Sequence, residues 1–192
     1  MWSHLVPAFR TTLVFTVLTG GLYPVAVTGV SAVLFPRQAH GSLLTRDGVV
    51  VGSALIGQAF TRPEYFHPRP SAASYDASAS TGSNFGPTNQ KLIDRVKASI
   101  AQYRQENPQY TGAIPADAVT ASASGLDPEI SPANAAIQAA RVARARHGDV
   151  AAVQALVDQA TTGAWLGFIG EPRVNVLQLN LSLDEHFGRL SR

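Results

Sequence analysis

Hydrophobic residues are concentrated near the start of the chain. Residues 11–35 contain no charged side chain, and a helix rising about 1.5 Å per residue would extend roughly 37 Å over this run. That is enough to cross the ~30 Å hydrocarbon core of a bilayer with some tilt. A cleavable secretory signal is the alternative, but its apolar run is usually about 7–15 residues and ends at a small-residue cleavage site. The pattern predicts an N-terminal tail over residues 1–10, a transmembrane helix over residues 11–35 and a soluble domain over residues 36–192.

Small and hydroxylated residues recur every four positions within the predicted span. Residues four apart lie on one face of a helix, and small residues let helix backbones approach closely in lipid. Pro24 removes a backbone donor, which predicts a kink. We therefore expect this face to dock against other transmembrane helices, although an anchor that faces lipid all round is the simpler alternative. The expected docking residues are Thr12, Thr16, Gly20, Tyr23, Pro24 and Thr28.

The remaining residues mix strand and helix patterns, which predicts a mixed α/β soluble domain attached to a single N-terminal transmembrane helix. Asp47-Gly48 between two apolar runs indicates a hairpin. Apolar positions spaced by three and four predict helices, and alternating leucines predict a final strand with one wet face. The helices are expected at residues 89–105, 132–147 and 149–160, and the strand at residues 174–183.

Two segments rich in proline, serine, alanine and glycine are expected to be irregular, residues 61–87 and 115–126. A loop as long as the first is usually functional or disordered in a compact domain. Its aromatic residues favour a loop that is ordered and docked on the domain. Those aromatics are Tyr65, Phe66, Tyr75 and Phe85.

Charge and composition exclude several classes of function. The net charge is +2 and cysteine is absent, so neither a disulfide framework nor a thiolate metal site is expected, and the weak basic bias indicates no nucleic-acid partner. The five histidines have no metal-binding spacing, so no metal site is expected. One basic cluster, Arg141, Arg144, Arg146 and His147, is interpreted as a solvated helix face. Arginines lie on both sides of the span, so charge does not decide its orientation.

Candidate catalytic groups are few, and no catalytic residue is expected. Residues 82–89 form a glycine-containing loop before a helix, where an anion can bind, but the absence of lysine favours a structural turn. Ser122 and Ser124 lack a Gly-x-Ser-x-Gly elbow. Glu171 and Arg173 are interpreted as an ion pair at the start of a strand or as an interface contact. The alternative function is a membrane-anchored nucleotide-binding or hydrolytic enzyme that uses the two serines with Asp127, or the 82–89 loop.

Six short strings in sequence order closely resemble the C subunit family (KdpC) of the bacterial Kdp potassium-transporting P-type ATPase. Each string alone is weak, whereas six in the same order are specific. The resemblance extends from Thr19 to Leu181, nearly the whole chain. The strings are residues 19–24, 52–58, 65–72, 82–89, 119–132 and 170–177.

The resemblance implies a single-pass subunit of the bacterial inner membrane with a periplasmic soluble domain. Its implied partners are a potassium-binding channel-like subunit, a P-type ATPase subunit and a small peptide subunit. It also implies an accessory role in assembly, as a catalytic chaperone that raises the ATP affinity of the ATPase subunit. The family is linked with ATP binding as well, but no phosphate-binding motif is visible here, so we expect no cofactor of the chain's own and an indirect effect on ATP bound elsewhere in the complex. Candidate interface or nucleotide-linked residues are Gln58, Tyr65, Phe66, Arg69, Asn84, Asn89 and Arg173.

Overall fold

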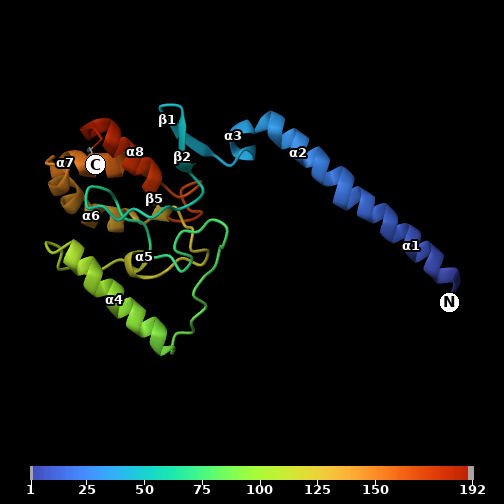
Figure 1. Cartoon of the computed structure of the whole chain (residues 1–192), viewed down its shortest axis with the longest axis horizontal. Coiled ribbons are helices and arrows are strands. Elements are labelled where there is room, and N and C mark those ends of the chain that lie inside the picture. Colours follow the sequence, from blue (N-terminus) through green and yellow to red (C-terminus); the bar gives the residue numbers. More distant parts are fainter. Residues whose placement is uncertain (1, 190–192) are drawn as a thin grey trace. The chain divides into compact units, whose positions relative to one another are not determined.

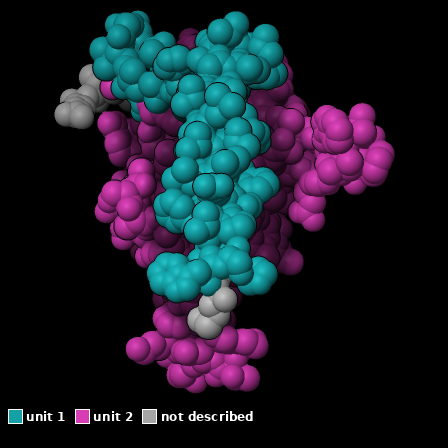
Figure 2. Space-filling model, turned by 90° about the vertical axis from the view of Figure 1, so that its right-hand side faces the viewer, with its two compact units in different colours: residues 1–51 teal, residues 52–192 magenta. Residues whose placement is uncertain are grey.

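The computed structural model describes residues 2–189. The chain divides into two compact units, Met1–Val51 and Gly52–Arg192, which are coloured separately in Figure 2. In the first unit, α1 and α2 join through a short π-helix, η1, into one helix over Trp2–Leu34 (Figure 1). A short helix and a hairpin follow. The bounds are α1 Trp2–Val17, η1 Leu18–Leu22, α2 Tyr23–Leu34, α3 Pro36–Ala39, β1 Leu43–Arg46 and β2 Val49–Ser53, whose last residues belong to the second unit.

Among the described residues, Trp2–Leu34 is the one helix that is long and apolar enough to cross a membrane. It begins inside the segment that the charge pattern assigns to a tail. None of its side chains is buried. A Cβ added at Gly20 or Gly29 would meet nothing within 4 Å, so the helix surface around both glycines is open.

A π-helical turn lies just before Pro24, where the sequence predicts a kink. The Tyr23 N–H donates to the Leu18 carbonyl, five residues back, and the Thr19 hydroxyl donates to the Phe15 carbonyl at 2.7 Å. A π-turn is the usual way for a helix to absorb a local mismatch in its hydrogen-bond ladder, and here it directly precedes the residue that has no N–H. The four-residue stripe therefore passes through a turn that is wider than an ideal α-helix.

The second unit packs helices around a small antiparallel sheet of order β3-β5-β4. Ile130 and Thr161 both pair with Val174 on the central strand. Helices α6, α7 and α8 lie together (Figure 1) and enclose the apolar core with Phe66 from the long loop. The bounds are α4 Gln90–Glu106, α5 Ala116–Val119, β3 Glu129–Ile130, α6 Pro132–Ala145, α7 Val150–Ala160, β4 Thr161–Thr162, β5 Arg173–Asn175 and α8 Val176–Phe187.

The mixed helix and sheet composition confirms the predicted fold class, and most predicted elements are present. The hairpin forms where Asp47-Gly48 indicated it. The three predicted helices are α4, α6 and α7, each with a side-chain cap on its first turn. These caps are Asn89, Ser131 and Asp149, which accept from the N–H groups of Lys91, Asn134 and Ala151.

The predicted strand over residues 174–183 is wrong, because only β5 is a strand and α8 follows it directly. Asn175 caps α8 by accepting from the Gln178 N–H. The alternating leucines suggested a period of two, but the buried residues follow the three-and-four spacing of a helix. They include Val176, Leu179, Asn180, Leu183 and Asp184. Asn180 and Asp184 belong to this buried stripe, and their polarity hid it from the hydrophobic pattern.

The loop over residues 61–87 contains neither helix nor strand. Its first part is docked as predicted, with Phe66 buried, whereas Phe85 near its end is exposed. The second irregular segment differs from expectation in one respect, since α5 forms a helical turn within it. The Thr120 hydroxyl donates back to the Ala116 carbonyl at 2.6 Å, which ends that turn.

Candidate functional site

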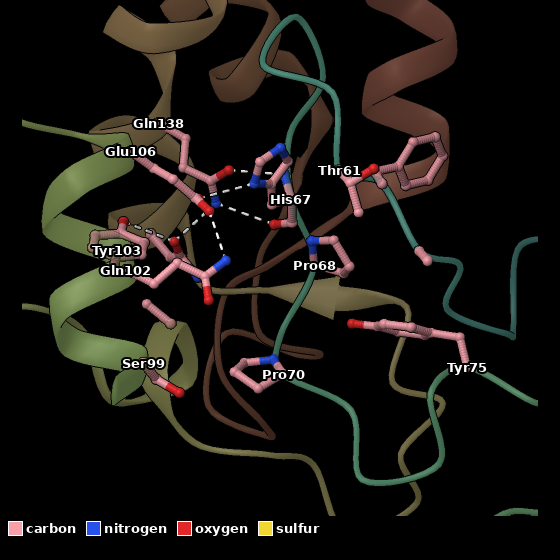
Figure 3. A pocket seen from close by; sticks show the side chains of 14 residues that line it. Thr61, His67, Pro68, Pro70, Tyr75, Ser99, Gln102, Tyr103, Glu106 and Gln138 are labelled. Carbon is pink, nitrogen blue, oxygen red and sulfur yellow. Dashed lines mark hydrogen bonds and ion pairs between the residues drawn. The ribbon is translucent and has the colours of Figure 1, made fainter. Parts of the chain in front are cut away.

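A cleft of about 280 Å³ opens on the second unit between the long loop and α4 (Figure 3). His67, Pro68, Pro70 and Tyr75 form its loop side, and the C-terminal half of α4 forms the other. The cleft is therefore bounded by residues 62–70, Arg-Pro-Glu-Tyr-Phe-His-Pro-Arg-Pro, which we call the clamped segment. Three prolines in this segment lack an N–H, so a regular ladder cannot satisfy its backbone.

Two buried amide side chains hold the middle of the clamped segment. Asn180 accepts from the Phe66 N–H at 2.8 Å and donates to the Phe66 carbonyl at 3.0 Å. Gln138 does the same for His67, at 2.8 and 3.1 Å. Each amide copies the donor–acceptor pair of a neighbouring strand. The segment is thus held between α6 and α8 as if it had a strand partner on each helix.

Two arginines of α6 and its C-terminal cap satisfy the carbonyls that precede Phe66. Arg141 donates to the Pro63 and Tyr65 carbonyls at 2.7 and 3.0 Å, and Arg146 donates to the Glu64 carbonyl at 2.8 Å. The interpretation of the basic cluster as a solvated face is therefore wrong for these two residues, which are 9% and 6% exposed. It is right for Arg144 and His147, which are exposed. Burial lowers the pKa of Arg141 from its ordinary value, and its carbonyl contacts offset part of its lost hydration.

A buried ion pair closes the far side of the clamped segment. Arg146 donates to an Asp184 carboxylate oxygen at 2.8 Å, and the Tyr65 hydroxyl donates to the same carboxylate at 3.1 Å. The Arg146 guanidinium also lies 4.9 Å from the centroid of the Tyr65 ring, within the range of a cation–π contact. Burial, and then the Asp184 carboxylate, raise the pKa of Tyr65, so this phenol is a hydrogen-bond donor at neutral pH.

An acid–base pair lies on the cleft wall where α4 meets the clamped segment. Figure 3 shows His67 and Glu106 pointing toward each other, and His67 Nδ1 lies 3.0 Å from Glu106 Oε2. His67 Nε2 lies 3.0 Å from the Arg62 carbonyl oxygen, so each ring nitrogen faces an oxygen acceptor. Arg141 Nη1, at 3.3 Å from Nε2, is an alternative donor to the neutral ring. The hydrogen bond from His67 lowers the pKa of Glu106.

The base of the cleft is a further set of satisfied polar groups. Tyr103 donates to Asn134 at 3.0 Å, and Asn134 donates to Asp117 at 3.1 Å. Asp117 also accepts from the N–H and the hydroxyl of Ser131. Burial, and then Asp117, raise the pKa of Tyr103, which keeps it neutral. These contacts tie α4, α5 and α6 together beneath the clamped segment.

The structure brings only three of the candidate interface residues together. Tyr65, Phe66 and Arg69 lie in the clamped segment, but Phe66 is 0% exposed and belongs to the core. Its predicted role as an interface side chain is therefore replaced by an anchoring role. Arg69 remains at the surface of the segment, where it donates to Asp127 at 2.8 Å, and Tyr75 donates to the Arg69 carbonyl.

The other candidate residues lie apart from the cleft. Asn84 is exposed in a left-handed conformation with φ 50°, and Asn89 caps α4. Gln58 lies against Gly52 so closely that a Cβ there would overlap its amide. Arg173 pairs with Glu129 at 2.9 Å, and not with Glu171 as the sequence suggested.

The residues of the enzyme alternative have structural partners. Ser122 and Ser124 accept from the N–H groups of Gly125 and Leu126 at 2.9 and 3.1 Å, as expected for hydroxyls in a tight turn. Asp127 is paired with Arg69. Residues 2–189 contain no group of three or more His, Cys, Asp or Glu side chains that can hold a metal.

Sequence reasoning did not identify Gln138, Arg141, Arg146, Asn180 or Asp184 as site residues. The sequence does contain a pattern from which they could have been found, because polar residues recur at helical spacing beside an apolar stripe. Asn134, Gln138 and Arg141 follow one another at intervals of four and three along α6, next to its buried alanines. A polar stripe of this kind adjoining a proline-rich loop is a usable signal for backbone clamping.

The fold and the site define a mixed α/β protein that has a long apolar N-terminal helix and holds an ordered loop. The family model described as K+-transporting ATPase, c chain (KdpC), matches residues 5–185. The Potassium-transporting ATPase KdpC subunit of Beijerinckia indica is 57% identical over 189 residues, covering 97% of this chain and 96% of the relative. The subunits of the same name from Caulobacter sp. K31 and Mycobacterium tuberculosis H37Ra are 60% and 55% identical, covering 97% and 96% of this chain and 96% and 99% of the relatives.

The chain therefore belongs to the KdpC family, the c chain of K+-transporting ATPases. This confirms the resemblance drawn from the six strings. Family membership and the apolar helix Trp2–Leu34 together indicate a membrane protein.

Proposed function

We propose that the chain is an accessory subunit of a high-affinity, ATP-driven potassium uptake pump and performs no catalysis of its own. The observation that carries this proposal is that polar side chains around the cleft bind other groups of the same protein. Gln138, Arg141 and Arg146 donate to backbone carbonyls of the clamped segment, and Glu106 is engaged by His67. Such an arrangement suits a rigid surface for another protein better than it suits the turnover of a substrate.

The proposed partners are a potassium-binding channel-like subunit, a P-type ATPase subunit and a small peptide subunit. We place the contact with transmembrane helices on the stripe that includes Thr16, Gly20 and Thr28. Support comes from the recurrence of small residues along this face, because close backbone approach favours packing between helices in lipid. Exposed parts of the clamped segment, Arg69 among them, and the loop around Asn84 are the proposed contacts of the soluble unit.

The proposed consequence is assembly of the pump and a higher affinity of the ATPase subunit for nucleotide. We place the soluble unit on the periplasmic side, away from cytoplasmic ATP, so its effect on nucleotide acts through the conformation of the ATPase subunit. A coupling of this kind typically changes affinity by about 5- to 150-fold. ATP is accordingly a ligand of the complex, and the chain needs no cofactor of its own.

Purified complexes test this proposal. Membranes that express the pump subunits with wild-type chain, with Gly20→Leu or with Gly29→Leu are solubilised, and potassium-stimulated ATPase activity is measured across ATP concentrations. At about 100° per residue, Gly29 lies roughly opposite Gly20 on the helix, so Gly29→Leu is a matched control. We expect Gly20→Leu to lose co-purification and Gly29→Leu to retain it.

The dependence on ATP separates the two proposed functions. A complex that contains the chain is expected to reach half-maximal activity at lower ATP than one that lacks it. An unchanged KM without the chain would contradict the accessory role. ATP hydrolysis by the purified chain alone would favour the membrane-anchored enzyme.

A further inference from the structure

One loop outside the cleft exposes a dense group of large apolar side chains. The loop Gly163–Gly170, Gly-Ala-Trp-Leu-Gly-Phe-Ile-Gly, joins β4 to β5. We call it the apolar loop. Trp165 is 66% exposed and Phe168 is 77% exposed, and Leu166 and Ile169 beside them are also exposed. Single exposed apolar residues are ordinary, whereas a contiguous group of this size marks a site of interaction.

Four backbone N–H groups of the apolar loop are paired within the loop itself. Trp165 and Ile169 exchange a pair of hydrogen bonds, N–H to carbonyl in both directions, at 2.8 and 2.9 Å. The N–H groups of Gly167 and Phe168 donate to the Ala164 and Trp165 carbonyls at 3.1 and 3.3 Å. The tight turn requires left-handed residues at its tip, and Gly167 with φ 82° supplies one at low cost. The loop can therefore leave water without exposing these four N–H groups unpaired.

We propose that the apolar loop inserts into the interfacial layer of the bilayer in which the helix Trp2–Leu34 is anchored. Entry into lipid is costly for a loop mainly because unpaired backbone groups lose their hydration. The four internal hydrogen bonds of this loop lower that cost, and the interfacial layer still hydrates the remaining backbone groups. Tryptophan is the side chain most characteristic of the membrane–water interface. No charged residue occurs from Gln159 to Gly170, so insertion buries no charge.

The bilayer is the apolar phase to which this chain is already tied. Residues 35–51 lie between the long helix and the second unit, and even fully extended they reach at most about 60 Å. A unit the size of the second one has a radius of gyration of roughly 14 Å. The apolar loop therefore stays within reach of the membrane surface on whichever side the unit lies. Tethering of this kind lets a weak second contact become well populated.

The chemistry of the apolar loop also indicates which lipid property it recognises. Lysine and arginine are absent from residues 159–172, so the loop has no cation to pair with anionic headgroups. The proposed contact is driven by apolar burial, and zwitterionic lipid is sufficient for it. It is expected to be insensitive to salt, unlike the polybasic segments that bind anionic membranes.

The two tryptophans of the chain, Trp2 and Trp165, allow a direct test. In full-length Trp2→Phe protein, Trp165 is the only tryptophan. This variant is reconstituted into phosphatidylcholine vesicles that contain lipids brominated on their acyl chains, and its fluorescence is compared with that in unbrominated vesicles. We expect blue-shifted emission, strong quenching by the brominated lipid and little quenching by aqueous iodide.

Two further variants show whether quenching is specific to the apolar loop. Leu166→Ser with Phe168→Ser, in the Trp2→Phe background, is expected to shift the ratio of inserted to free loop toward free by at least about tenfold. Val150→Trp in a Trp2→Phe, Trp165→Phe background places the reporter at an exposed position on α7. We expect this control to remain open to iodide and unquenched by brominated lipid.

Two results would overturn the proposal. One is a Trp165 that is quenched by iodide and not by lipid in the reconstituted chain. The other is a Trp165 that becomes shielded only when the other pump subunits are present, still without lipid quenching, which would make the loop a protein contact. Neither result bears on the accessory function, because that is tested by co-purification and by the ATP dependence of the complex.

Discussion

The clamped segment and the apolar loop are both irregular, and they achieve order in opposite ways. Residues 62–70 obtain their hydrogen bonds from side chains of α6 and α8, such as Gln138 and Asn180. Residues 163–170 form theirs within the loop, where Trp165 and Ile169 bond to each other. A segment that relies on other elements becomes part of the core. A segment that satisfies itself is free to expose its apolar side chains.

The difference shows where polar side chains contribute most to the stability of this protein. The buried arginines, amides and carboxylate all surround the clamped segment, and none of these contacts is made to the apolar loop. Removing one partner of a buried hydrogen bond costs more than the bond itself contributes, because the remaining group has no water to replace it. Substitutions should therefore have very different effects in the two regions.

The largest effect is expected from Arg146→Met. This change removes the Arg146 cation that pairs with the buried Asp184 and the donor to the Glu64 carbonyl. Breaking a buried pair from one side typically costs about 3–5 kcal/mol in the free energy of unfolding. Denaturant unfolding of the full chain in detergent measures it. The matched control is Arg144→Met, which replaces an exposed arginine near the end of α6. It should change the free energy of unfolding by less than about 0.5 kcal/mol. Equal losses in the two variants would contradict the importance of the buried pair.

Asn180→Leu tests the amide clamp by itself. The substitution leaves the N–H and carbonyl of Phe66 buried and unpaired, which is expected to cost about 2–4 kcal/mol from two groups of about 1–3 each. Hydrogen exchange of the Phe66 amide should accelerate along with the loss of stability. Gln178→Leu, on the exposed face of α8, serves as the control. An unchanged free energy of unfolding for Asn180→Leu would mean that water replaces the Asn180 amide as the partner of the Phe66 backbone.

Gly167→Val addresses the apolar loop through its backbone. A β-branched residue at φ 82° is expected to cost about 1–2 kcal/mol of local stability. Leu166→Ser, which removes a large exposed side chain from the adjoining position, should cost less than about 0.5 kcal/mol. Hydrogen exchange of the Ile169 amide measures both. A larger loss of protection in Leu166→Ser than in Gly167→Val would contradict this expectation. It would show that side-chain packing, and not the loop's own hydrogen bonds, orders the loop.

The smallest expected effect is the pH dependence from Glu106. Its pKa is lowered from an ordinary 4.5, mainly by the hydrogen bond from His67, so the native state favours the carboxylate. The stabilisation is fully present above the ordinary pKa and is lost as the pH falls through the lowered one. Because the pair is partly exposed, it is worth about 1 kcal/mol or less.

Unfolding measured from pH 7 to pH 3 compares the wild type with Glu106→Gln. The wild type is expected to be the more stable above about pH 5, and the difference should narrow below pH 4.5. The glutamine variant keeps the shape of the side chain but cannot titrate. A constant difference across this range would show that the carboxylate charge plays no part.

The sequence pattern correctly predicted the elements that depend on residues close to them in the chain. The Asp47-Gly48 hairpin and the helices α6 and α7 form as expected, because the turn and the caps at Ser131 and Asp149 depend on contacts within a few residues. The strand predicted over residues 174–183 failed because Asn180 and Asp184, which are polar, occupy the buried face. Their burial is stabilised by the backbone of Phe66 and by Arg146, which lie far away in sequence.

The candidate site shows the same limit. Tyr65 and Arg69 were candidates because their string is distinctive. Gln138 and Asn180, whose amides hold the segment, lie 71 and 114 positions farther along the chain than the residues that they bind. The cluster around Arg141 looked solvated because charge normally indicates exposure. Three prolines in the clamped segment leave its carbonyls in need of donors, and that need explains why two arginines are buried beside it.

Hydrogen exchange of the wild-type full chain in detergent tests the contrast between the two regions most directly. The amides of Phe66 and His67 are expected to exchange only through global unfolding, since buried side chains accept from both. The amides of Trp165 and Ile169 should exchange faster, through local opening of the loop. Exchange of Phe66 and His67 as fast as that of the apolar loop would contradict the account.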